Sequence, residues 1–158
     1  MTTESLATSE AIESMTDEFL ASTSSHQEMI ETVISTLQQH DTAMVQHTEK
    51  GYLWKFQYGS VEVFVQLTGE SDDDFLTVWS SVLKLPVQDE LGLTRKLLAM
   101  NCAETFESHF AIMNDQVVVI SQRSVADLSA GEISRAITLV ATVADNNDEM
   151  LRKSFGGS

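Results

Sequence analysis

Two runs of alternating apolar side chains, separated by a glycine, constrain this fold more than any other part of the sequence. Every second position is apolar in the first run (Tyr52, Trp54, Phe56, Tyr58) and in the second (Val61, Val63, Val65, Leu67). Alternate side chains of a strand point to the same face. A two-residue loop at Gly59-Ser60 would place both apolar sets on one face. The pattern therefore predicts a β-hairpin, and its register is well specified because a one-residue slip would send one set to the opposite face.

Further strands are expected on both sides of this hairpin. A short one lies near residues 44–47, and an acidic turn at residues 70–74 leads into a strand over residues 75–84. That strand is apolar on both sides, with Phe75, Trp79 and Leu83 on one side and Leu76, Val78 and Val82 on the other. A strand of this kind is either covered on both faces or has one face available to a partner.

A second hairpin is expected later in the chain. Its strands cover residues 106–113 and 116–122, and the pair Asn114-Asp115 is typical of the tight turn between them.

Three helices complete the pattern. Ser25 and Glu28 have the spacing of a capping box, and an apolar stripe behind them predicts a helix over residues 26–40. A second helix is expected over residues 87–101, with Pro86 at its start and Arg95 and Lys96 near its negative end. Another capping box, Ser129 with Glu132, opens a long final helix that stops near Gly156.

These elements predict one α+β domain over residues 25–156. We expect an antiparallel sheet, three strands plus a β-hairpin, packed with three helices in the order α-β-β-β-α-β-β-α. A chain of 158 residues is long enough for one domain with a substantial core.

Residues 1–24 are rich in Ser, Thr and Glu, so we expect them to form a mobile acidic tail. Within it, four apolar residues recur at helical spacing: Ile12, Met15, Phe19 and Leu20. Docking of this stripe as a short helix, on this domain or in a larger assembly, stays open as an alternative.

Charge and composition exclude several function classes. The formal net charge is −15, and the nine basic residues are scattered along the chain. Binding to nucleic acid or to an anionic membrane requires clustered Lys and Arg, so we expect neither partner. The single cysteine, Cys102, excludes an intrachain disulfide. The N-terminus lacks the basic and apolar regions of a secretory signal, so we expect a cytoplasmic protein.

No catalytic or cofactor motif is present. The four histidines (His26, His40, His47, His109) show no metal-ligand spacing, and we expect no metal and no cofactor. An EF-hand loop beginning at Asp72 fails because Thr77 occupies the glycine position and Leu83 the glutamate position. Cys102 lies near a helix end that disfavours the thiolate, so we expect a structural cysteine. The sequence therefore indicates a protein that is not an enzyme.

Three segments carry a resemblance to a known family: Leu128-Ser129-Ala130-Gly131-Glu132-Ile133, Ala144-Asp145-Asn146-Asn147-Asp148-Glu149 and Phe155-Gly156-Gly157. Together with the order of elements, they resemble the YbjN-like branch of the type III secretion chaperone-like fold, and cyanobacterial members in particular. The resemblance implies an acidic homodimer that binds extended client segments, or a regulator of sensory transduction. It supplies no active-site residues.

We therefore expect a protein-binding module, chaperone-like or regulatory, that acts as a homodimer or on a protein client. The candidate contact surface is the sheet face opposite the aromatic core, with Leu53, Phe64, Leu76, Val78 and Val82. Two alternatives stay open: these residues lie under a helix of the same domain, or the chain is a small-ligand-binding domain or enzyme with an unrecognised pocket.

Overall fold

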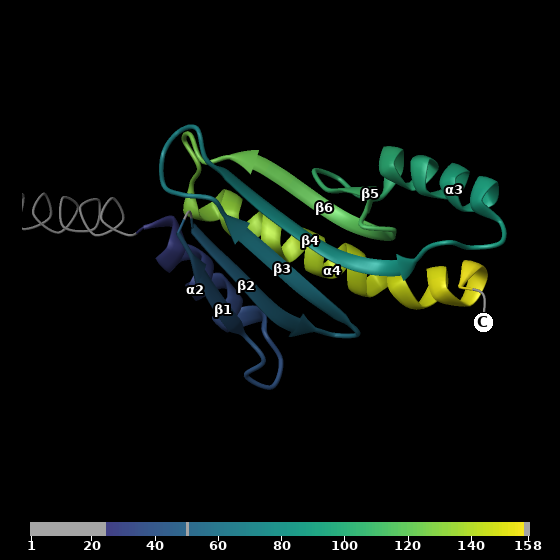
Figure 1. Ribbon diagram of the computed structural model, residues 1–158, viewed down its shortest axis with the longest axis horizontal. Coiled ribbons are helices and arrows are strands. Elements are labelled where there is room, and N and C mark those ends of the chain that lie inside the picture. The colour runs from purple at the N-terminus through teal and green to yellow at the C-terminus, as the bar shows by residue number, and fades with distance from the viewer. Residues whose placement is uncertain (1–24, 50, 157–158) are drawn as a thin grey trace, which may run out of the picture.

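The computed structural model of this protein describes residues 25–49 and 51–156 (Figure 1). The mobile tail and the apolar stripe predicted within residues 1–24 lie outside the described residues. The elements are α2 (His26–Leu37), β1 (Met44–Thr48), β2 (Gly51–Tyr58), β3 (Val61–Leu67), β4 (Phe75–Lys84), α3 (Glu90–Ala103), β5 (His109–Met113), β6 (Gln116–Ser124) and α4 (Ala130–Phe155).

The strands form one antiparallel sheet in the order β1-β2-β3-β4-β6-β5. The predicted α+β class, with an antiparallel sheet and three helices, is confirmed. The predicted order of elements omits one strand, because four strands precede α3. The short strand expected near residues 44–47 is β1, which pairs with β2 along its whole length, from Met44 opposite Lys55 to Thr48 opposite Gly51.

The first predicted hairpin is β2–β3, and its register is the predicted one. Trp54 lies opposite Val65 and Phe56 opposite Val63, so both apolar sets share one face. Gly59 adopts a φ of +56° in the loop, a backbone conformation that glycine tolerates best. A Cβ atom at this position would lie 2.1 Å from the nearest carboxylate oxygen of Asp145 on α4. The loop therefore needs glycine for its conformation and for its close contact with the helix.

The second hairpin, β5–β6, turns at Asn114 and Asp115 as predicted, and both residues have positive φ angles. Its first strand begins at His109 rather than at residue 106. Phe106 is exposed and has a φ of 55°, so it belongs to the preceding turn.

The core lies between the sheet and α4. Figure 1 shows α4 running along the length of the sheet on one side, with α2 beside it on the same side. The buried stripe of α4 contains Ile133, Ile137, Val140, Ala144 and Leu151, which pack against the apolar faces of the strands. Ser129 caps the start of this helix as predicted, because its hydroxyl accepts a hydrogen bond from the Glu132 amide, and the same hydroxyl donates to the Glu132 carboxylate.

The middle helix differs from its prediction at both ends. It begins after the N-cap Asp89, whose carboxylate accepts from the Gly92 amide, and not at Pro86. It continues to Ala103, so Arg95 and Lys96 lie in its middle and do not complement its C-terminal dipole.

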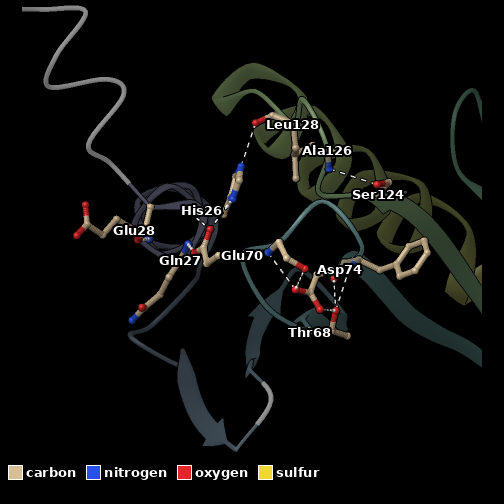
Figure 2. Close-up of polar contacts among 12 residues, drawn as sticks. His26, Gln27, Glu28, Thr68, Glu70, Asp74, Ser124, Ala126 and Leu128 are labelled. Carbon is tan, nitrogen blue, oxygen red and sulfur yellow. Dashed lines mark hydrogen bonds and ion pairs between the residues drawn. The ribbon is translucent and has the colours of Figure 1, made fainter.

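The start of α2 is held by residues distant in sequence (Figure 2). Ser25 caps the helix as predicted, accepting from the Glu28 amide at 3.1 Å. The Glu70 carboxylate, from the turn between β3 and β4, also accepts from the backbone amides of His26 and Gln27. A carboxylate at a helix N-terminus satisfies unpaired amides and interacts favourably with the helix dipole. Glu70 therefore ties α2 to the sheet.

Replacing Glu70 by Ala tests this contact. Loss of a helix cap typically costs about 1 kcal/mol, so Glu70→Ala should lower the free energy of unfolding by about that amount in urea denaturation. Asp72→Ala removes a carboxylate from the same turn and serves as the control, with a smaller effect expected. Equal effects of the two substitutions would contradict a specific role for Glu70.

Candidate functional site

The five residues of the predicted contact surface lie on two different faces of the sheet. Leu76, Val78 and Val82 are fully buried on the side covered by the helices. Val78 lies opposite Val65 and Leu76 opposite Leu67, so pairing places them on the same face as the aromatic residues of β2. These three residues therefore contribute to the core and are not accessible to a partner, as in the alternative of burial under a helix of the same domain.

The other two residues, Leu53 and Phe64, lie half-buried on the opposite side of the sheet, which we call the open face. In the view of Figure 1, none of the described helices lies over this face. The open face also carries two residues that the predicted surface omitted, Trp79 and Ile120. Pairing places Phe64 opposite Trp79 and Trp79 opposite Ile120, which forms an apolar row across β3, β4 and β6.

The rings of Phe64 and Trp79 stack on each other, with centroids 5.4 Å apart and an interplanar angle of 9°. Such an aromatic pair contributes roughly 0.5–1.5 kcal/mol beyond the area it buries. Lys55, opposite Phe64, forms an ion pair with Glu62 at 2.9 Å. The centre of the open face is thus a fixed aromatic pair beside a charged pair.

The sequence contained the signal for Trp79, because Phe75 and Trp79 form the second apolar side of the 75–84 strand. Leu83 was expected on the same side as Phe75 and Trp79, but it does not lie there. The register between β4 and β6 shifts between Ser81 and Leu83, and Leu83 is buried in the core. A bulge of this kind redirects the side chains that follow it, and alternation alone does not predict its position.

The two edges of the sheet differ. At β5, the Asn101 side chain on α3 accepts from the Phe110 amide at 2.7 Å and donates to the Phe110 carbonyl at 3.3 Å. A side chain of α3 thus satisfies the backbone N–H and C=O groups of Phe110 at this edge. At the other edge, all five residues of β1 are exposed, including Met44 and Val45.

A groove of about 820 Å³ lies near the C-terminal end of α4 and the end of β4. It brings Lys84 and Arg152 together with Glu62 and Ser60. Arg152 forms an ion pair with Asp148, whose side chain is fully buried and contacts the Ser60 hydroxyl at 2.8 Å. The positive charge of Arg152 is thus already compensated within the fold.

The acidic turn at residues 70–74 uses one of its carboxylates internally (Figure 2). Asp74 accepts from the Ser71 hydroxyl at 2.7 Å, from the Ser71 amide at 3.0 Å and from the Thr68 hydroxyl at 2.9 Å. Hydrogen bonds from the Ser71 hydroxyl first, then from the Ser71 amide and Thr68, lower the pKa of Asp74. This carboxylate therefore closes the turn.

Other chemistry-bearing groups do not converge. Cys102 is exposed on α3, which contradicts the expected structural cysteine. Over residues 25–49 and 51–156, no three His, Cys, Asp or Glu side chains are grouped so that they could hold a metal ion. None of the helices in this part of the chain has the length and apolar character needed to cross a bilayer.

Comparison with protein families gives a match over residues 26–153 to the YbjN family, described as putative bacterial sensory transduction regulators. The chain belongs to the YbjN family. The YbjN-like resemblance expected from the sequence is thereby confirmed. A search of curated proteins found no match. Among solved structures, the crystal structure of the ExsC-ExsE complex contains a similar chain, with 18% identity and a TM-score of 0.46, covering 72% of this chain and 79% of that one.

The role of Asp74 in this YbjN-family chain predicts a pH dependence. The folded-state pKa is lowered, so Asp74 stabilises the fold above its unfolded pKa of about 3.9, and this stabilisation is lost as the pH falls through the lower folded value. Asp74→Asn should therefore lower the melting temperature at pH 7. Below about pH 4, the melting temperatures of Asp74→Asn and wild type should become more similar. Asp73→Asn removes a charge from the same turn and should show a smaller difference. A difference for Asp74→Asn that does not change with pH would contradict this prediction.

Proposed function

We propose that this YbjN-family protein is a non-enzymatic, regulatory protein-binding module that binds its partner through the open face. The observation that carries the proposal is the stacked Phe64–Trp79 pair, continued by Ile120, on a sheet face over which none of the helices of residues 25–49 and 51–156 lies in Figure 1. Aromatic residues at the centre of a surface are typical of the residues that dominate binding energy at protein interfaces.

The net charge of the chain indicates the chemistry of the partner. The chain carries a net charge of −15, so basic segments are attracted and other acidic surfaces are repelled at long range. We therefore expect a partner protein that presents an apolar centre surrounded by Lys and Arg. The homodimer and the cytoplasmic location expected from the sequence remain predictions.

Phe64→Glu tests the open face. A charge placed against a desolvated aromatic contact should weaken partner binding at least about ten-fold, which corresponds to about 1.4 kcal/mol. The measurement is co-purification of partners with the tagged protein from its native cells, quantified by mass spectrometry, together with sedimentation of the pure protein. A change in sedimenting mass would assign the open face to self-association.

Phe106→Glu is the matched control, because it makes the same substitution at an exposed phenylalanine outside the sheet. Circular dichroism should show that both variants are folded. If Phe64→Glu leaves both the partners and the sedimenting mass unchanged, or if Phe106→Glu has the same effect, the open face is not the binding surface.

The small-ligand alternative has one observation in its favour, the 820 Å³ groove that contains Lys84 and Arg152. A ligand that binds only the folded state raises the melting temperature. A thermal-shift screen of anionic metabolites, in wild type and in Lys84→Ala, would detect such a ligand. A rise that depends on Lys84 would favour this alternative over the protein-binding proposal.

A further inference from the structure

A groove between α2 and β1 lies on the helix side of the sheet, away from the open face. We call it the α2–β1 groove; it has a volume of about 160 Å³ and is lined mainly by Ile34, Ser35, Gln38, Val45 and Trp54. Val45 lies opposite Trp54, so its side chain points to the helix side of the sheet, yet it is 56% exposed. The helices thus leave the edge of their own side of the sheet uncovered.

One wall of this groove is formed by a buried aromatic residue. Trp54 is 2% exposed, and within the described residues its indole N–H has no hydrogen-bond partner. Ile34 and Val45 add apolar surface to the groove on either side of Trp54. The α2–β1 groove is therefore suited to a segment that brings apolar side chains.

We infer that this groove binds the N-terminal segment of the same chain, with Ile12, Met15 and Phe19 as the contact residues. These residues recur at helical spacing, while Glu10 and Asp17 fall on the opposite side of such a helix. Docking would therefore bury the apolar stripe and leave these two carboxylates in solvent.

The place where this segment joins the fold supports the inference. The chain enters α2 at Ser25, and the position of His26 is fixed by Glu70 and by the Leu128 carbonyl. Residues 21–25 have the length of a connection between antiparallel helices, roughly two to five residues. A helix over residues 11–20 would be about 15 Å long, similar to the roughly 18 Å of α2. It would run back along α2 and bring Ile12 toward Gln38 and Phe19 toward Glu31.

Tethering makes the segment an effective occupant despite its small contact area. A short covalent connection raises the effective concentration of the segment to about millimolar. Docking would then be reversible, and it would be independent of the open face and of the function proposed for it.

The reactivity of a cysteine placed in the groove tests this inference in the full-length chain. Cys102 is the only cysteine and is exposed, so the background is Cys102→Ser. Val45→Cys then reports on the groove. Ile112→Cys reports on the opposite edge, where Ile112 is 61% exposed and also points to the helix side, because it lies opposite the buried Val117. The rate of modification by a thiol reagent is measured for both.

We expect Phe19→Glu to release the segment and to raise the rate at which the thiol reagent modifies the cysteine at residue 45. If about 90% of molecules are docked, the increase is about ten-fold, because only the open fraction reacts. Ser14→Glu adds the same charge on the opposite side of the helix and should leave the rate unchanged. The rate at residue 112 should be the same in all chains.

A second measurement uses the native side chains. The indole N–H resonance of Trp54, assigned with Trp54→Phe, should shift in Phe19→Glu and not in Ser14→Glu. An unchanged resonance and an unchanged rate at residue 45 in Phe19→Glu would overturn the inference. If the cysteine at residue 45 reacts slowly only at high protein concentration, the inference would also be overturned, because the occupant would then be a second copy of the chain.

Discussion

The burial of one face of the sheet, mainly under the long helix α4, is the constraint on which the rest of this structure depends. Val63, Val65 and Val78 are completely buried, and Ile133 and Ile137 of α4 are completely buried against this face. Each such side chain contributes roughly 1.5–3 kcal/mol when it leaves water. Because strand side chains alternate, this contact also determines which residues point away from the core. The open face is therefore a consequence of how α4 packs.

The same one-sided arrangement explains why the two sheet edges differ. One helix cannot cover six strands, so the edges need separate protection against pairing with other chains. At β5, Asn101 supplies both a donor and an acceptor to the backbone of Phe110. At β1, protection from α2 is incomplete, and Val45 stays exposed beside the buried Trp54. Apolar surface is thus available at two separate places, the centre of the open face and the edge of the helix side.

Local patterns in the sequence predict most of this fold, and contacts between distant segments account for what they miss. The alternation around Gly59 is sufficient for the first hairpin, because its register depends only on neighbouring residues. The face of the sheet was predicted correctly for Leu53 and Phe64 only, and binding of a partner there stays a prediction. Alternation shows that the 75–84 strand is apolar on both sides, but it does not show which side α4 covers, so Leu76, Val78 and Val82 were assigned to the wrong face. The cap of α2 by Glu70 and the edge contact of Asn101 join residues far apart in the sequence, and no local motif indicates them.

His26 illustrates how contacts between distant segments position the elements of this fold. Its Nδ1 lies 2.6 Å from a Glu70 carboxylate oxygen, and its Nε2 lies 3.1 Å from the Leu128 carbonyl oxygen (Figure 2). Glu70 and Leu128 are 44 and 102 residues away from His26 in the sequence. This corner joins α2, the β3–β4 turn and the segment before α4, and it therefore determines where the N-terminal residues leave the fold.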